Sequence, residues 1–65
     1  MLGCVVEGHG EERVVEVVLN WLGVRHRPVY RADGKPDLLR RAREYAELQL
    51  ARGATEVLFF FDADG

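Results

Sequence analysis

Two short, uninterrupted apolar runs near the two ends of the chain constrain its fold more than any other feature. Residues 2–6 form the first run and residues 57–61 form the second, and an acidic residue follows each run directly. Neither run alternates with polar residues, and this pattern is typical of a strand that is buried on both faces of a parallel sheet. The sequence therefore predicts two central strands of such a sheet.

Two further segments carry apolar residues at helical spacing. The first covers residues 11–22, where two acidic residues open the predicted helix and Gly23 follows its end. The second covers residues 36–52, beginning at a proline suited to a first helical turn and followed by Gly53. The predicted inner stripes are Val14, Val15, Val18, Leu19, Trp21 and Leu22 in the first helix, and Leu39, Ala42, Ala46 and Leu50, flanked by Leu38 and Tyr45, in the second.

The elements follow one another as strand, helix, strand, helix, strand. Residues 24–30 are predicted to form the middle strand, and Pro28 within it indicates an edge strand or an irregular one. Alternating strands and helices imply parallel strands joined by right-handed crossovers. Because the two most apolar strands belong side by side, we expect a three-stranded parallel α/β sheet of order 2-1-3, as in doubly wound folds. Residues 1–65 are expected to form a single small domain.

Charge, size and cysteine content exclude several classes of protein. A formal net charge of −2 excludes a basic nucleic-acid clamp, although eight basic residues gather between Arg25 and Arg52. The single cysteine, Cys4, has no partner for an internal disulfide. No signal-peptide pattern or run of membrane-spanning length is present, so we expect a soluble, cytoplasmic protein without a membrane partner. A core this thin also predicts a homo-oligomer or a missing partner domain.

Three carboxylates follow the two apolar strands. Glu7 comes directly after the first strand, and Asp62 and Asp64 follow the last one. Neighbouring parallel strands meet at one carboxyl edge of the sheet, where open α/β sheets bind their ligands. Three like charges at close range require either protonation or a bound cation, and hard oxygen ligands select Mg²⁺, Mn²⁺ or Ca²⁺. This pattern predicts a divalent-metal site, whereas the alternative is an aspartate pair that merely forms a turn.

The residues around these carboxylates resemble the motifs of Toprim domains. An apolar strand followed by Glu7 and Gly8 is similar to the opening Toprim motif, and an apolar strand followed by Asp62 and Asp64 is similar to the second. The Glu-Gly-His-Gly-Glu sequence of residues 7–11 is most similar to small bacterial Toprim-like proteins related to the overcoming-lysogenization-defect nucleases. The resemblance covers the whole chain but only the front portion of a Toprim domain, so the chain is expected to be a fragment or a minimal version.

This resemblance implies metal-dependent phosphodiester chemistry on DNA or RNA, as in topoisomerases, primases and nucleases. Glu7 would be the general acid or base, or a metal ligand, and Asp62 and Asp64 would bind Mg²⁺ or Mn²⁺. Gly8 would let the backbone turn closely beneath the site. Whether the chain is itself an active enzyme stays open. The candidate contacts to substrate phosphates are His9, Arg25, Arg27, Arg31 and Lys35. The basic residues among them equally suit the protection of an edge strand by charge.

Two other functions stay open on the sequence. An isolated α/β unit would expose one edge of its last strand and would self-associate there without catalysing a reaction. A phosphatase of the haloacid-dehalogenase type would use Asp62 as its nucleophile, but that family places its aspartate motif after the first strand of the core. The Asp-x-Asp pattern also occurs in nucleotide-sugar glycosyltransferases.

Overall fold

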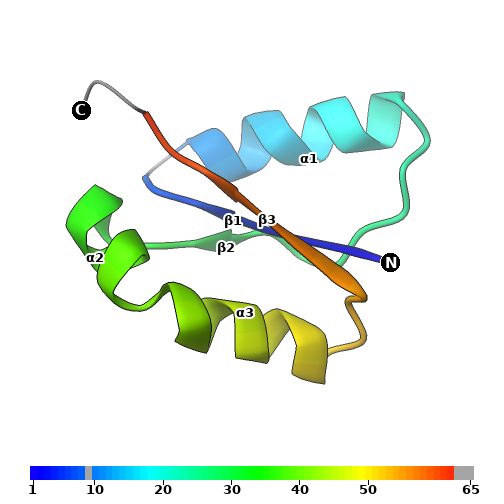
Figure 1. The fold of residues 1–65 in the computed structure, drawn as a ribbon. Coiled ribbons are helices and arrows are strands. Elements are labelled where there is room, and N and C mark those ends of the chain that lie inside the picture. The colour runs from blue at the N-terminus through cyan, green and yellow to red at the C-terminus, as the bar shows by residue number, and fades with distance from the viewer. Residues whose placement is uncertain (9, 63–65) are drawn as a thin grey trace.

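A computed structural model, which describes residues 1–8 and 10–62, shows a three-stranded parallel sheet between two layers of helices (Figure 1). The strand order is β2-β1-β3. The predicted α/β class and the predicted 2-1-3 order are therefore confirmed. In chain order the elements are β1 (Leu2–Val6), α1 (Glu11–Trp21), β2 (Tyr30–Arg31), α2 (Gly34–Arg40), α3 (Ala42–Ala51) and β3 (Glu56–Phe60).

The central strand β1 lies between the two helix layers. It pairs with β3 over its whole length, from Leu2 beside Glu56 to Val6 beside Phe60. Its last three residues are fully buried, as the unbroken apolar run predicts. Val5 belongs to the core on the side of α2 and α3, where it packs with Ala32, Leu38, Tyr30, Tyr45, Val57 and Phe59. None of the helices in the described part of the chain is both long and apolar enough to cross a bilayer.

The strand β2 is much shorter than the strand predicted over residues 24–30. His26 makes one isolated bridge to Leu2, and regular pairing with β1 resumes only at Tyr30. Between these points lies Pro28, which has no backbone N–H to donate to a ladder. The irregular edge strand predicted from Pro28 is therefore present, but its regular part begins only at Tyr30.

Gln49 of α3 fills the gap that the irregular segment leaves in the sheet. Its Nε2 atom donates hydrogen bonds of 2.9 Å to the carbonyl of Cys4 and 3.0 Å to the carbonyl of Pro28. The side chain is fully buried. The approach requires Gly3, because a Cβ at this position would lie 2.9 Å from Cβ of Gln49. The fold therefore replaces missing strand pairing with a side-chain amide from a helix.

The single helix predicted over residues 36–52 is two helices in the structure. The break falls at Arg41, whose φ of −110° and ψ of 20° leave the helical range. The bend lets Leu38 of α2 and Tyr45 of α3 both reach the core around Val5. No proline or glycine marks this position, so the sequence gives no local signal for the break.

The predicted inner stripes of the helices are wrong in part. In α1 the sheet-facing residues include Val15 and the buried Leu19, whereas Val14, Val18, Trp21 and Leu22 are exposed, Trp21 to 83%. In the second helical segment, Leu38 and Gln49 are buried, whereas Leu39 and Leu50 are exposed. Apolar residues surround much of α1, so helical periodicity alone does not decide which side meets the sheet.

Candidate functional site

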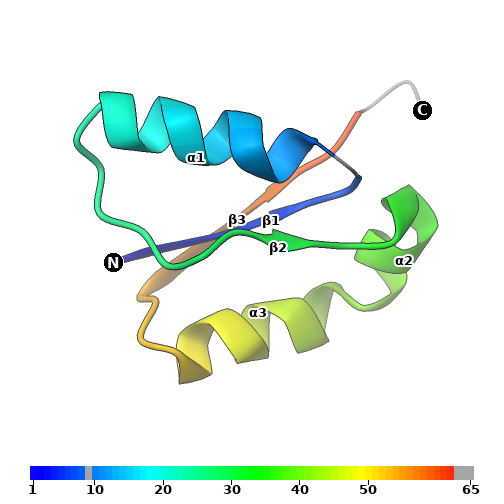
Figure 2. The ribbon, with the colours of Figure 1, turned by 180° about the vertical axis from the view of Figure 1, so that it is seen from behind.

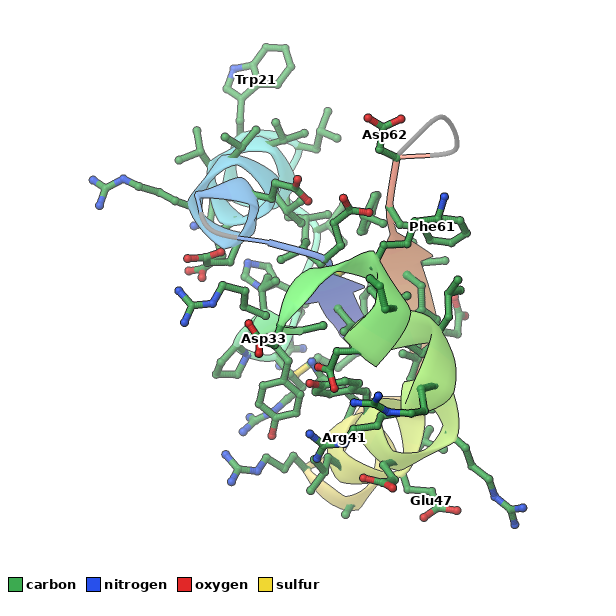
Figure 3. All side chains as sticks on the ribbon, turned by 90° about the vertical axis from the view of Figure 1, so that its left-hand side faces the viewer. Trp21, Asp33, Arg41, Glu47, Phe61 and Asp62 are labelled. Carbon is green, nitrogen blue, oxygen red and sulfur yellow. The ribbon has the colours of Figure 1, made fainter. Side chains whose placement is uncertain are left out.

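The two acidic motifs meet at the carboxyl edge of the sheet. Glu7 directly follows β1 and is half-buried, and Asp62 lies two residues beyond β3. The backbone N–H of Asp62 donates a hydrogen bond of 2.9 Å to Oε2 of Glu7. Figure 3 shows Asp62 standing beyond the end of β3. The strand order therefore brings together residues that are 55 positions apart in sequence.

Lys35 reaches the same edge from the first turn of α2. Its Nζ donates a hydrogen bond of 2.8 Å to the carbonyl oxygen of Asp62 and lies 5.7 Å from the ring centroid of Phe61. Gly34 makes this placement possible, because its φ of +86° turns the chain directly before Lys35 and its N–H donates to the carbonyl of Glu7 at 2.8 Å. One cationic side chain is thus held beside the two carboxylate-bearing residues.

A second pair of charges lies near this edge. Arg31 ends β2, and its guanidinium lies 3.9 Å from the carboxylate of Glu12 in the first turn of α1. The Oε2 atom of Glu12 is buried and has no hydrogen-bond partner among the described residues. Helical periodicity did not single out Glu12, because an acidic residue in a first helical turn is ordinarily explained by the helix dipole.

Arg25 and Arg27 lie at the opposite end of the sheet. The carbonyl of Arg25 accepts a hydrogen bond from the N–H of Leu2, and the N–H of Arg27 donates to the carbonyl of Leu2. Leu2 begins β1, whereas Glu7 follows its end, so the structure does not bring these arginines to the carboxylates. Figure 2 shows the loop before β2 beside the N-terminus, away from α2.

The remaining predicted site residues divide into two groups. His9 and Asp64 lie outside the described residues, so the structure leaves their predicted roles open. Gly8 is described, and a Cβ added there would meet no described atom within 4 Å. Its φ is not positive. The described glycines at this edge that adopt a positive φ are Gly10 and Gly34.

The described residues supply part of the predicted metal site. The carboxylates of Glu7 and Asp62 and the carbonyl of Asp62 are hard oxygen donors of the kind that Mg²⁺ prefers. Within residues 1–8 and 10–62, no group of three or more histidine, cysteine or acidic side chains is arranged to hold a metal ion. The donor chemistry fits a divalent metal, and the predicted third carboxylate is Asp64.

A second polar cluster holds α2 against α3. The buried carboxylate of Asp37 accepts hydrogen bonds from the N–H of Asp33 at 2.9 Å and from the hydroxyl of Tyr45 at 2.7 Å. Arg40 and Arg41 lie 3.5 and 3.6 Å from its other oxygen. The hydrogen bond from Asp33, then that from Tyr45, lowers the pKa of the Asp37 carboxyl, and the same carboxylate raises the pKa of the Tyr45 hydroxyl. The cluster stabilises the bend between the helices.

The thiol of Cys4 plays no part in either cluster. It is fully buried in β1, and burial raises the pKa of the thiol. A buried thiol with a raised pKa is a poor nucleophile and a poor metal ligand. Cys4 is therefore a small core residue, in agreement with its position in the apolar run.

Comparison of the chain with protein-family models, with curated proteins and with solved structures gave no match. The resemblance to Toprim motifs thus rests on the residues around Glu7 and Asp62.

Proposed function

We propose that the chain is a Toprim-like module that binds a divalent metal, Mg²⁺ or Mn²⁺, and processes nucleic-acid phosphodiesters in the cytoplasm. The metal ligands are the carboxylates of Glu7, Asp62 and Asp64. The observation that carries this proposal is the hydrogen bond from the N–H of Asp62 to the carboxylate of Glu7. It joins the two acidic motifs at the edge where parallel α/β sheets bind ligands.

The chemistry of this edge suits a phosphate group. A metal ion held by carboxylates neutralises charge on a phosphoryl group and activates water. Lys35 adds a positive charge directly beside Asp62. As a flexible cation it suits a phosphate oxygen of DNA or RNA. Glu7, which is only half-buried, retains access to solvent and thus to a substrate proton.

A titration with Mn²⁺, followed by electron paramagnetic resonance, tests the metal site. Replacing both aspartates, Asp62→Asn with Asp64→Asn, should abolish binding, because it removes two anionic ligands and keeps similar side-chain volumes. Asp33→Asn is the matched control, because Asp33 is an exposed acid that follows β2 at the same carboxyl edge of the sheet. Binding that survives the double substitution would rule out the metal assignment.

One observation favours the alternative function, a non-catalytic α/β unit that self-associates. Leu58 and Phe60 of the edge strand β3 are 47% and 38% exposed. Their register partners Cys4 and Val6 are buried on the same sheet face, where α1 packs against β1 and β2. Sedimentation equilibrium of the chain and of Leu58→Lys tests this alternative, since a charge on an unprotected edge opposes strand pairing.

The phosphatase alternative lacks such support. Asp62 follows β3, which is the third strand along the chain and lies at the edge of the sheet. A haloacid-dehalogenase-type nucleophile follows the first strand of its core. We therefore expect beryllium fluoride, an analogue of the aspartyl phosphate, to leave Asp62 unmodified.

A further inference from the structure

The helix α1 carries a second apolar surface that faces away from the sheet. We call it the outer stripe, and it consists of Val14, Val17, Val18 and Trp21, which are 63%, 59%, 45% and 83% exposed. Their spacing places them on one side of the helix, opposite Val15 and Leu19. Figure 3 shows Trp21 projecting away from the sheet. A contiguous apolar surface on a solvent-facing helix marks an interaction site.

The outer stripe combines a hollow with a protruding side chain. The hollow has a volume of about 290 Å³ and extends along α1 from Gly10 to Val18, lined by Gly10, Arg13, Val14, Val17 and Val18. Trp21 protrudes from the last turn of the same helix. Trp21 is two turns, about 10 Å, beyond Val14. Trp21 thus lies on the same stripe, beyond the C-terminal end of the hollow.

We propose that this surface binds a second copy of the chain, with the two α1 helices packed antiparallel about a two-fold axis near Val17 and Val18. In that arrangement Val17 faces Val18 of the second copy, and Trp21 faces Val14 of the second copy. Each Trp21 then enters the hollow of the other copy. A two-fold interface requires a self-complementary surface, and the outer stripe meets this requirement. The proposal is independent of metal binding.

Charge favours the antiparallel arrangement. The outer stripe contains no charged residue, and the flanking Glu11 and Arg13 both lie near its N-terminal end. Antiparallel packing separates Glu11 and Arg13 from the same residues of the second copy. It also places the two helix dipoles in opposite directions. Arg13 lines the hollow that receives the indole, so its guanidinium is placed for a cation–π contact with Trp21 of the second copy.

The available area lies near the lower limit for a specific dimer. The four exposed side chains offer roughly 500 Å² of mainly apolar surface per copy, against about 800 Å² per partner in a standard interface. Neighbouring residues such as Leu22, which is 60% exposed, extend the contact. An aromatic anchor in a pocket typically dominates such an interface.

The position of the stripe argues for another molecule rather than an extension of this sheet. A strand added beside β3 would lie in the sheet, and its right-handed crossover helix would lie on the face that α3 covers. Neither element would reach the outer side of α1. The edge of β3 offers exposed apolar side chains too, among them Leu58 and Phe60.

The single tryptophan of the chain makes the proposal directly measurable. Sedimentation equilibrium and tryptophan emission are recorded together over a concentration series of the chain. We expect the average mass to rise from one chain to two while the emission moves to shorter wavelength, because the indole leaves water. Trp21→Ala should weaken dimerisation by on the order of tenfold or more.

Val18→Glu supplies the decisive variant, because it places two carboxylates close to the proposed axis. Leu48→Glu is its matched control, since Leu48 is 46% exposed on α3 against 45% for Val18 on α1. Circular dichroism checks that both variants fold. We expect Val18→Glu to be monomeric and Leu48→Glu to dimerise normally. Mixing Val18→Glu with Val18→Lys should restore dimers, because opposite charges then meet near the axis.

Three results would overturn the proposal. The first is a chain that stays monomeric at every concentration. The second is a dimer that Val18→Glu and Leu48→Glu affect equally. The third is a dimer that only Leu58→Lys dissociates, which would assign the interface to the edge of β3.

Discussion

The backbone N–H of Asp62 donates a hydrogen bond of 2.9 Å to the carboxylate of Glu7, so the end of β3 is fastened to the end of β1 by a proposed functional side chain. The bond serves both structure and chemistry. It fixes the orientation of one Glu7 oxygen.

We predict that Glu7→Gln separates these two roles. The glutamine keeps a carbonyl oxygen that can accept the hydrogen bond from Asp62, so the free energy of unfolding should change little. It removes one anionic ligand, and Mn²⁺ affinity should fall by on the order of tenfold or more. Calorimetric titration with Mn²⁺ and urea unfolding give the two values. Equal Mn²⁺ affinity in Glu7→Gln and the unsubstituted chain would contradict a ligand role for Glu7.

Lys35→Met should weaken nucleic-acid binding without unfolding the chain. Methionine keeps an apolar stem near the ring of Phe61 but removes the ammonium group beside Asp62. The slope of log affinity against log salt should therefore fall by about one unit. Fluorescence anisotropy of a labelled single-stranded oligonucleotide measures this slope at several salt concentrations.

Arg25→Met is the matched control for Lys35→Met. It also removes one cation, but from the loop beside Leu2 at the far end of β1. We expect its salt slope and affinity to match those of the unsubstituted chain. A larger loss with Arg25→Met than with Lys35→Met would move the nucleic-acid surface away from the carboxylates.

Gln49→Leu should destabilise the fold by about 1–3 kcal/mol, because the buried carbonyl of Cys4 and the partly buried carbonyl of Pro28 lose their donor. The leucine has a similar volume, so packing should suffer less than hydrogen bonding. Urea unfolding measures the change in free energy. Glu47→Gln, two residues away at an exposed position, is the control and should stay close to the unsubstituted chain. A neutral Gln49→Leu would mean that the carbonyls of Cys4 and Pro28 find other donors.

The Asp37 cluster predicts a loss of stability in acid. Its hydrogen bonds lower the folded-state pKa of Asp37 below the ordinary value of about 4. The unfolded chain therefore binds a proton first as the pH falls, and the contribution of Asp37 is present above about pH 4 and lost below it. Thermal unfolding between pH 2 and 7 should show a shallower acid dependence in Asp37→Asn, whose neutral amide does not titrate.

The hydroxyl of Tyr45 should make the stability of the fold fall as the pH rises in alkali. Its hydroxyl donates to Asp37, which raises its folded-state pKa above the ordinary value of about 10. The contribution of Tyr45 is fully present below about pH 10 and is lost as the pH rises through the folded-state pKa. Tyr45→Phe should remove this alkaline dependence in thermal unfolding. A Tyr45→Phe variant with the same alkaline profile would show that another group causes it.

Strand order and the meeting of Glu7 with Asp62 could be predicted because both follow from the apolar runs. Continuous apolar character identifies the central strands, and parallel pairing then places their carboxyl ends together. Lys35 also follows a strand, so its place at this edge agrees with the same topology. Arg25 and Arg27 precede β2, and residues that precede a parallel strand lie at the opposite edge.

The details of packing could not be predicted in the same way. Apolar residues cover more than one side of α1, so the helical pattern alone does not identify the side that meets the sheet, which the burial of Leu19 reveals. The break at Arg41 depends on Asp37 and Tyr45 meeting across the bend, which no local sequence signal reveals. The role of Gln49 depends on the carbonyl groups left by Pro28 in a distant segment.

The pairing of β1 with β3 sets the order of events during protein synthesis. Leu2 lies beside Glu56 and Val6 beside Phe60, so the central strand has only two regular partners in β2 until the last strand arrives. Ribosomes make the chain from the N-terminus at about 5–20 residues per second, which exposes β1 for seconds before β3 leaves the exit tunnel. This apolar strand of the nascent chain is therefore a natural target for chaperones at the ribosome.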